Sequence, residues 1–481
     1  MKITALNPPF LPHFSRGQRS PAVTRSGTMY YPIWLSYAAG ALEQADHVVQ
    51  LIDAPAMNKD ETEVLKNISE FNPALVIVET STPSIINDVQ IADIIQDKGF
   101  DVFLTGTHPS ALPKETIALG NSFKGAVLGE YELPLLAVCE AIEQGGNIEG
   151  ISGTAVRSGD AVIVTPPSGF LDDLDSLPFV SSVYKRHLPV ERYNNPNALH
   201  PQVMLMGGRG CPNMCSFCVF PQTLTGRRYR SRSASSVVDE MLWVEENMPE
   251  VKAVFFEDDT IAADTGRLRE LAEEMIRRNV SISWTCNMRA SVDLETLKIC
   301  RSAGLRSVCV GFESGSDRIL ASMHKGITVE RMKQFKKDAS KAKILVHGCF
   351  LFGIPGETRE TAAETLKFAL ELNPDTAQFY PLMVYPGTDA YRKVSDEGLL
   401  AASSWRDWLK ADGTHACVVR TEDMTPEELV EFCDHCRRKF YLRPVYILRK
   451  IWRSLIDSNE RHRTMLAFRT FRKYLFKGKN G

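Results

Sequence analysis

The chain has 481 residues, of which 44% are apolar and 24% are charged, and its formal net charge is −3. This length suggests two or three domains, and the charge balance argues against a nucleic-acid-binding protein. Residues 1–9 run into a proline turn, so no signal peptide is expected, and no apolar run has transmembrane length. Eleven cysteines without an export signal indicate reduced thiols in the cytoplasm.

Residues 1–150 alternate short apolar runs with amphipathic patterns, which is typical of an open α/β sheet. A helix is expected over 33–45, and strands are expected over 2–6, 48–52, 75–79, 101–105 and 125–128. Ligands of such sheets bind beyond the carboxyl ends of the strands. Small or turn-forming residues at those ends leave room for a large ligand; the candidates are Asn7, Thr80, Ser81, Thr82, Gly106, His108, Gly129 and Glu130. Residues 151–199, with an acidic stretch that ends at Pro178, are expected to form a linker.

Residues 207–218 place Cys211, Cys215 and Cys218 at C-x3-C-x2-C spacing behind a glycine-rich turn. Three thiols within eight residues can face one point only if the chain wraps around something. Four thiolates close a zinc site or fill an iron–sulfur cluster, whereas three leave one position open for chemistry. The alternatives are a zinc knuckle or buried free thiols, but no fourth Cys or His lies at zinc-finger spacing.

Residues 200–395 predict six strands, over 202–206, 253–257, 282–286, 307–311, 344–352 and 376–382, each but the last followed by a helix. One of these helices is expected to begin with Ser236 as its N-cap. Active sites of parallel barrels collect at the carboxyl ends of the strands. The polar and glycine-rich residues there are Glu257, Asp258, Asp259, Asn287, Arg289, Glu313, Gly353 and Pro355.

Other groups of residues allow two interpretations. The basic run at residues 227–232 would face phosphates or simply be solvated. Five further cysteines fall in apolar patterns and are expected in the core: Cys139, Cys286, Cys300, Cys309 and Cys349. A C-x2-C pair, Cys433 and Cys436, lies in a helical pattern without a partner pair.

Residues 396–481 are expected to form a basic, helical segment. From Arg437 onward there are fourteen Lys and Arg but two acids, with aromatic and aliphatic residues between them. A basic amphipathic helix is typical of a membrane surface, which would suit a lipid-linked substrate. The alternative is a helix packed on the barrel with its basic face in water.

The cysteine motif and the strand-end residues resemble the radical S-adenosylmethionine (SAM) superfamily. The resemblance implies a partial (β/α)6 barrel and a [4Fe–4S] cluster held by Cys211, Cys215 and Cys218, with SAM chelating the fourth iron. It also implies the residues that contact SAM. Phe217 would lie beside the adenine, Glu257, Asp258 and Asp259 near the amino group, Asn287, Arg289 and Glu313 at other polar contacts, and Gly353 to Pro355 on the adenine side.

The first segment resembles the Rossmann-like, flavodoxin-like cobalamin-binding domain that precedes many radical SAM cores. Residues 31–35, 51–53, 105–109 and 128–132 carry this likeness. The D-x-H-x-x-G motif, which supplies a histidine to cobalt in other cobalamin proteins, is absent. Cobalt would therefore be held without a histidine from that motif.

The combined resemblance, to a subset with methyltransferases and with ring-forming enzymes of tetrapyrrole and hopanoid pathways, implies a radical enzyme. Reductive cleavage of SAM would give a 5′-deoxyadenosyl radical that removes hydrogen from an unactivated carbon, followed by cobalamin-dependent methyl transfer. The alternatives are radical cyclisation, rearrangement or dehydration, with or without bound cobalamin, or a non-catalytic iron–sulfur or cobalamin carrier. Implied partners are a small-molecule or lipid-linked substrate and a flavodoxin- or ferredoxin-type electron donor. The implied location is the cytoplasm, with peripheral contact to the inner membrane face.

Overall fold

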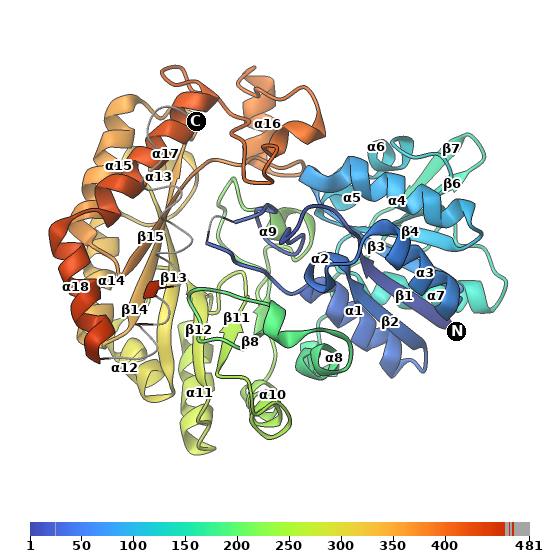
Figure 1. The fold of residues 1–481 in the computed structure, drawn as a ribbon, viewed down its shortest axis with the longest axis horizontal. Coiled ribbons are helices and arrows are strands. Elements are labelled where there is room, and N and C mark those ends of the chain that lie inside the picture. The colour runs from blue at the N-terminus through green and yellow to red at the C-terminus, as the bar shows by residue number, and fades with distance from the viewer. Residues whose placement is uncertain (25, 457–460, 462–463, 466–481) are drawn as a thin grey trace.

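The computed structural model describes residues 1–24, 26–456, 461 and 464–465. Two α/β domains lie side by side in it, with α9 (Val219–Thr223) between them (Figure 1). Each domain is built on a sheet whose strands are mostly parallel. The six residues of the strand at 75–80 are all buried, as expected for a central parallel strand that is covered on both faces.

The first domain has seven strands in the order β2-β1-β3-β4-β5-β6-β7. The strands are β1 (Lys2–Asn7), β2 (Val48–Asp53), β3 (Leu75–Thr80), β4 (Asp101–Gly106), β5 (Gly125–Val127), β6 (Thr154–Ser158) and β7 (Ala161–Thr165). The helices are α1 (Ile33–Gln44), α2 (Ala54–Met57), α3 (Glu61–Phe71), α4 (Ile85–Asp97), α5 (Thr107–Ala111), α6 (Pro113–Ala118) and α7 (Glu132–Glu143). The parallel order 2-1-3-4-5 is the predicted flavodoxin-like arrangement, whose ligand-binding switch point lies between β1 and β3.

The five predicted strands and the predicted helix of this domain are present. Strands β6 and β7 were not predicted, and they lie in the segment expected to be a linker. They form an antiparallel hairpin on the edge strand β5. The two-residue turn Gly159-Asp160 between two alternating runs is a hairpin signal that the sequence does carry. The remaining connection includes α8 (Val180–His187), which packs on α1.

The second domain is an open, all-parallel sheet of six strands in the order β15-β14-β13-β12-β11-β8. Its strands are β8 (Gln202–Leu205), β11 (Ala253–Phe256), β12 (Ser283–Met288), β13 (Leu305–Glu313), β14 (Leu345–Phe352) and β15 (Thr376–Pro381). The helices that follow are α10 (Ala234–Asn247), α11 (Thr265–Arg277), α12 (Leu294–Ser302), α13 (Asp317–Ser322), α14 (Val329–Lys341), α15 (Arg359–Leu372) and α16 (Asp389–Asp396). All six predicted strands of the partial barrel are confirmed.

The predicted N-cap of α10 is wrong by one turn. Ser233, not Ser236, caps the helix, since its Oγ accepts the backbone N–H of Ser236 at 3.1 Å. Four serines within residues 231–236 made the sequence signal ambiguous. A two-stranded ribbon, β9 (Gly208–Arg209) with β10 (Arg230–Ser231), adjoins the loop that carries the cysteine motif.

The C-terminal segment is only partly helical. The 3-10 turn η4 (Trp405–Trp408) lies in a long stretch, 397–425, that crosses back onto the first domain. The helices α17 (Pro426–Tyr441) and α18 (Pro444–Ile456) then run along the outside of the barrel (Figure 1). Cys433 and Cys436 are buried on α17, as the helical pattern predicted. No helix among the described residues is long and apolar enough to cross a membrane. Most of the predicted basic tail after residue 456 falls outside the described residues.

Candidate functional site

The cysteine motif forms the loop between β9 and α9. Gly210 permits the turn that starts the loop, since its φ is +86° and a Cβ there would lie 2.1 Å from the carbonyl oxygen of Arg228. The N–H of Cys211 then donates to the carbonyl of Gly226 at 3.2 Å. The backbone therefore fixes the loop at its beginning, before any cofactor is considered.

The loop brings its three thiols together. Cys211, Cys215 and Cys218 are free cysteines. Burial and then Asp259 raise the pKa of Cys218 to about 12, and the other two thiols add smaller contributions. The Arg289 Nη1 lies 3.7 Å from the Cys215 sulfur, so a cation stands beside the thiols. Three thiols and an adjacent cation fit a [4Fe–4S] cluster with one iron left open.

Asp258 and Asp259, predicted to lie near SAM, hold the cysteine loop itself. Asp258 accepts the N–H of Gly207 at 2.8 Å, and Asp259 accepts the N–H of Gly210 at 3.1 Å and the hydroxyl of Thr225 at 2.8 Å. Burial raises the pKa of Asp258 to about 7. Its Oδ2 has no hydrogen-bond partner among the described residues, so it is an acceptor available to a ligand.

The long loop between β1 and α1 enters the barrel mouth. This contact between the two domains was not predicted from the sequence. Arg19 of this loop pairs with the carboxylate of Glu257 and donates to the carbonyl of Asp258 at 2.9 Å. Its guanidinium lies 5.0 Å from the centre of the Phe220 ring. Asn287 donates to the other oxygen of Glu257 at 3.2 Å. Burial raises the pKa of Glu257, and these two partners offset part of that rise.

A second charged pair lies on the other side of the cysteine loop. Glu313, which has a φ of +63°, accepts from the ammonium of Lys325 at 2.9 Å. The same ammonium lies 5.7 Å from the centre of the Phe217 ring, and Arg289 donates to the backbone carbonyl of Lys325. The predicted residues Phe217, Arg289 and Glu313 therefore meet at one place, with Lys325 as the residue that joins them.

A cavity of about 270 Å³ opens beside the cysteine loop. Phe217 and Ser216 line it from the loop, and Ile354 and Pro355 line it from the turn after β14. Phe217 and Pro355, which were predicted near the adenine, therefore border one cavity. Gly353 begins this turn with a φ of +90°.

Glu357 holds the turn after β14 and gives a testable pH dependence. Its Oε2 accepts the N–H of Gly353 at 2.6 Å, and burial raises its pKa from 4.5 to about 7. Between pH 4.5 and about 7 the folded protein therefore keeps a proton on Glu357 that the unfolded chain has lost. The contribution of Glu357 to the free energy of unfolding is thus present below pH 4.5 and is lost as the pH rises to about 7. We expect Glu357→Gln to gain stability over the wild type, by up to about 3 kcal/mol, between pH 5 and pH 8 in urea denaturation. A difference that does not change with pH would contradict this assignment.

Several of the predicted residues at the carboxyl ends of the first sheet bond to neighbouring residues of the same domain. Asn7 donates to Asp53 at 2.8 Å and accepts from Arg16 at 2.8 Å. Thr80 donates to the carbonyl of Thr105 at 2.8 Å. The hydroxyls of Ser81 and Ser84 lie 2.8 Å apart, while the φ of Gly106 is +126° and that of Gly129 is +76°.

The buried polar atoms at this edge that have no hydrogen-bond partner among the described residues include His108 Nε2 and Glu79 Oε2. Thr82 bonds the other nitrogen of His108 at 3.1 Å, and Trp405 stacks edge-on against the ring at 4.9 Å. Burial lowers the pKa of His108 to about 3 and raises that of Glu79 to about 8, so burial favours the neutral form of both groups. Unmatched polar atoms at the carboxyl ends of β3 and β4 fit a large polar cofactor such as cobalamin.

Buried ion pairs join the two domains. Arg230 donates to Glu130 at 2.6 Å, and Arg209 donates to Glu132 at 2.7 Å. The two interpretations of the basic run at residues 227–232 were wrong for Arg230 and Arg232. Neither side chain faces solvent, and each already has a carboxylate partner. Both are buried, and Arg232 pairs with Glu240 of α10. Glu130, a predicted cofactor contact, likewise has Arg230 as its partner.

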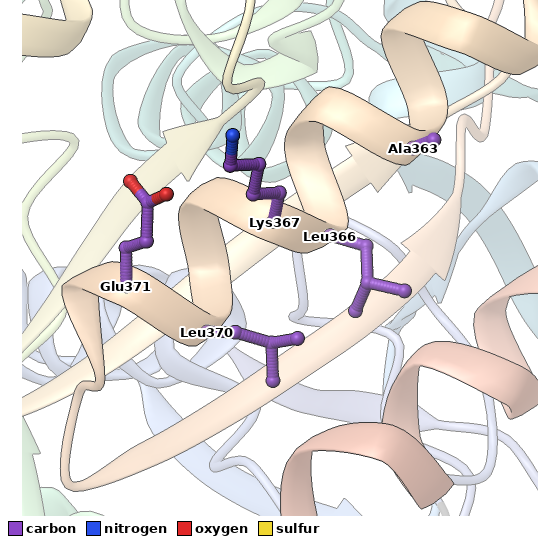
Figure 2. A pocket seen from close by; sticks show the side chains of 5 residues that line it. All are labelled: Ala363, Leu366, Lys367, Leu370 and Glu371. Atoms are coloured by element: carbon purple, nitrogen blue, oxygen red, sulfur yellow. The ribbon is translucent and has the colours of Figure 1, made fainter.

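A shallow hollow of about 420 Å³ lies on the outside of the barrel. Figure 2 shows that its five lining residues, Ala363, Leu366, Lys367, Leu370 and Glu371, all come from the helix α15. One helix face brings no converging polar groups together, so this hollow is not the functional site.

Comparison with known protein families agrees with the two halves of this site. The B12 binding domain family matches residues 19–139, and the Radical SAM superfamily matches residues 205–369. The first match covers strands β2 to β5 of the first sheet and includes His108 and Glu79. The second begins in the strand before the cysteine loop and ends in α15.

Individual relatives align with most of this chain. An uncharacterized methyltransferase of Pyrococcus horikoshii is 29% identical over 89% of this chain and 91% of its own length. The anaerobic magnesium-protoporphyrin IX monomethyl ester cyclase of Rubrivivax gelatinosus is 27% identical over 76% of this chain and 66% of its own length. The solved structure of the methyltransferase TsrM from Kitasatospora setae, with cobalamin and a [4Fe–4S] cluster bound, has a TM-score of 0.72 at 18% identity and covers 98% of both chains. This likeness confirms the predicted two-domain α/β fold.

Proposed function

This chain unites a B12-binding domain with a radical SAM domain, and we propose that it is a cobalamin-dependent radical SAM enzyme that methylates an unactivated carbon. The family matches imply a [4Fe–4S] cluster, SAM and cobalamin as its cofactors. Cys211, Cys215 and Cys218 would hold the cluster, and the switch point beside His108 would hold cobalamin. When bound, the cluster supplies the electron that cleaves SAM, and cobalamin supplies a carrier for the methyl group.

The observation that carries this proposal is the contact between the two cofactor sites. The helix α5 directly follows β4, and α9 directly follows Cys218; these two helices pack against each other. A Cβ on Gly387 would lie 2.9 Å from Ala111 of α5 and 2.7 Å from Thr223 of α9, so no side chain fits between them. The packing of α5 on α9 therefore brings the two cofactor sites close to each other.

The chain's own residues would position the substrate and exclude water. Asp258 and Asp259 fix the cysteine loop, and Phe217 borders the cavity beside it. Arg19 covers Glu257 and closes the barrel mouth toward the first domain. An external one-electron donor of flavodoxin or ferredoxin type would reduce the cluster, and the substrate would be a small or lipid-linked molecule.

Isotope transfer tests this proposal. Protein reconstituted without oxygen, incubated with hydroxocobalamin and desalted, should keep about four iron and one cobalamin per chain. With reductant and SAM that carries a deuterated methyl group, it should release 5′-deoxyadenosine and place the label on carbon in a small-molecule extract. Radical cyclisation, rearrangement or dehydration is the second candidate, because a cyclase is among the relatives. Release of 5′-deoxyadenosine without label in any product would favour that candidate and reject methyl transfer.

The helix α18 supports contact with an anionic lipid surface. The alternative was a helix packed on the barrel with its basic face in water. The helix α18 does pack on the barrel, but its basic side chains face the barrel. Arg453 pairs with Asp375 at 2.5 Å, and Arg449 donates to the carbonyl of Pro374 at 3.3 Å. The apolar side chains instead face outward: Val445, Leu448, Ile451, Trp452, Leu455 and Ile456 are all more than half exposed. The basic sequence that follows would complement lipid phosphates.

Substitution on this face gives the second prediction. The double variant Leu448→Ser/Trp452→Ser should lose most of its flotation with vesicles that contain anionic lipid, since these side chains make the exposed apolar face. Leu133→Ser, at a half-exposed leucine of the first domain, is the control and should float like the wild type. Equal flotation of all three proteins would reject membrane contact through α18.

A further inference from the structure

Two of the cysteines predicted in the core lie elsewhere. Cys309 on β13 and Cys349 on β14 are only half-buried, whereas their neighbours Val308, Val310 and Phe350 are completely buried. Successive side chains of a strand point to opposite faces, so the cysteines share a face that the core residues do not. The prediction failed because the sequence of a buried parallel strand does not distinguish its two faces.

That face points toward the lumen of the barrel. The register pairs Cys309 with His347 and Gly311 with Cys349. A Cβ on Gly311 would lie 2.1 Å from Glu313 and 3.0 Å from the ammonium of Lys325. Because Lys325 also lies over Phe217, the strand face that carries the two thiols is the one directed at the cysteine loop.

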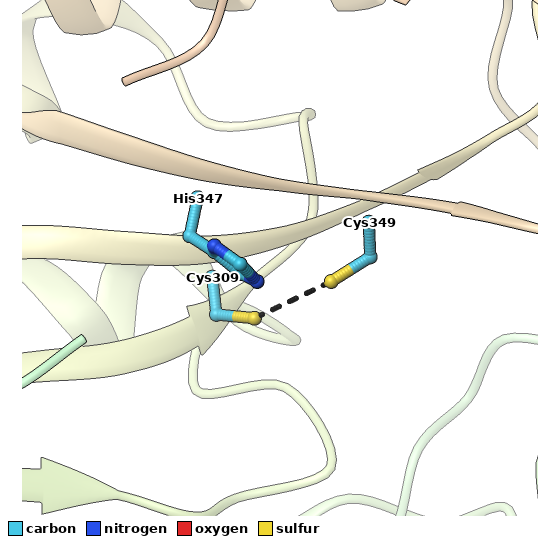
Figure 3. Close-up of side chains that lie close together, drawn as sticks. All are labelled: Cys309, His347 and Cys349. Carbon is cyan, nitrogen blue, oxygen red and sulfur yellow. Dashed lines mark hydrogen bonds between the residues drawn. The ribbon is translucent and has the colours of Figure 1, made fainter. Parts of the chain in front are cut away.

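The side chains of Cys309, Cys349 and His347 converge in the lumen (Figure 3). The two sulfurs are 3.7 Å apart, and the three ligand atoms all lie within 4.8 Å of one another. Tetrahedral zinc with Zn–S bonds of about 2.3 Å places two sulfurs about 3.8 Å apart. The thiols therefore already have the separation that a zinc ion requires.

The third candidate ligand, His347, is oriented by a residue of a neighbouring strand. The Nδ1 of His347 lies 2.8 Å from the hydroxyl oxygen of Thr376 on β15. Metal-binding histidines commonly use one ring nitrogen for such a bond, which fixes the tautomer and directs the other nitrogen to the metal. The site thus draws ligands from two neighbouring strands and an orienting group from a third.

We propose that Cys309, His347 and Cys349 bind one Zn²⁺ ion whose fourth position opens into the barrel lumen. Two thiolates and an imidazole match the ligands of catalytic zinc sites, which keep one position for water or substrate. The group that occupies the open position is an anionic oxygen or sulfur of the substrate. The identity of this group rests on the proposed function, whereas zinc binding does not.

Zinc content tests the site in the full, cluster-reconstituted protein. After incubation with Zn²⁺ and passage over a chelating resin, the wild type should keep one zinc per chain by elemental mass spectrometry. The double variant Cys309→Ser/Cys349→Ser should fall to background, and Cys139→Ala/Cys300→Ala, at two other cysteines, should keep its zinc. The proposal would be overturned if the wild type kept no zinc, or if Cys309→Ser/Cys349→Ser kept as much zinc as the wild type.

A second readout distinguishes this site from the cluster loop and from misfolding. Bound zinc should protect the peptides of Cys309 and Cys349 from alkylation by iodoacetamide, as read by mass spectrometry. Protection of the Cys211, Cys215 and Cys218 peptides alone would overturn the site. The variant Thr376→Val, which removes only the orienting bond, should keep its four iron and lose about 10- to 100-fold in zinc affinity. These outcomes do not depend on whether SAM is cleaved or a methyl group is transferred.

Discussion

Replacing Cys215 with alanine should remove the [4Fe–4S] cluster and reduce SAM cleavage to background. The remaining thiols, Cys211 and Cys218, would leave two irons of the cluster without a protein ligand. Cys215 is also the least exposed of the three cysteines and the one beside Arg289. Iron and sulfide assays after anaerobic reconstitution should fall from about four atoms of each per chain to less than about one. Formation of 5′-deoxyadenosine under reducing conditions should disappear with the cluster.

The matched control is Cys300→Ala, at a buried cysteine of α12. Loss of that sulfur removes core packing alone, which costs about 1 kcal/mol, and should leave iron content and SAM cleavage unchanged. If Cys215→Ala retained four iron per chain, or if Cys300→Ala lost its cluster, the motif would not be the cluster site.

The parts of this molecule that the sequence predicts are those set by local pattern. Strand periodicity identified all six barrel strands, and the spacing of Cys211, Cys215 and Cys218 identified the cofactor loop. Each of these signals is contained in a short stretch of the sequence. The hairpin β6–β7, which was not predicted, also has a local signal, because the Gly159-Asp160 turn is typical of a two-residue hairpin loop.

The parts that the sequence does not predict depend on partners far along the chain. Arg19 meets Glu257, 238 residues away, and Arg230 meets Glu130, 100 residues away. An isolated arginine carries no sign of whether it will be solvated or buried, because its burial requires the carboxylate of another domain. The same reasoning applies to Cys309 and Cys349, whose sulfurs become neighbours only through the pairing of β13 with β14.

The ion pair between Arg209 and Glu132 gives the largest expected effect on stability. Both side chains are almost completely buried, and they connect the barrel to α7 of the first domain. Arg209→Met keeps much of the apolar contact with Trp34 but leaves the carboxylate buried without its partner. Breaking one side of a buried pair costs about 3–5 kcal/mol, whereas replacing both sides with apolar residues is often nearly neutral.

We therefore expect Arg209→Met to lose about 3–5 kcal/mol in urea denaturation, and Arg209→Met/Glu132→Leu to regain most of that loss. The control is Arg228→Met, which breaks the exposed pair of Arg228 with Asp172 and should cost less than about 1 kcal/mol. Limited proteolysis should cut Arg209→Met between the domains faster than either other variant. Equal losses for Arg209→Met and Arg228→Met would show that burial of the pair does not hold the two cofactor domains together.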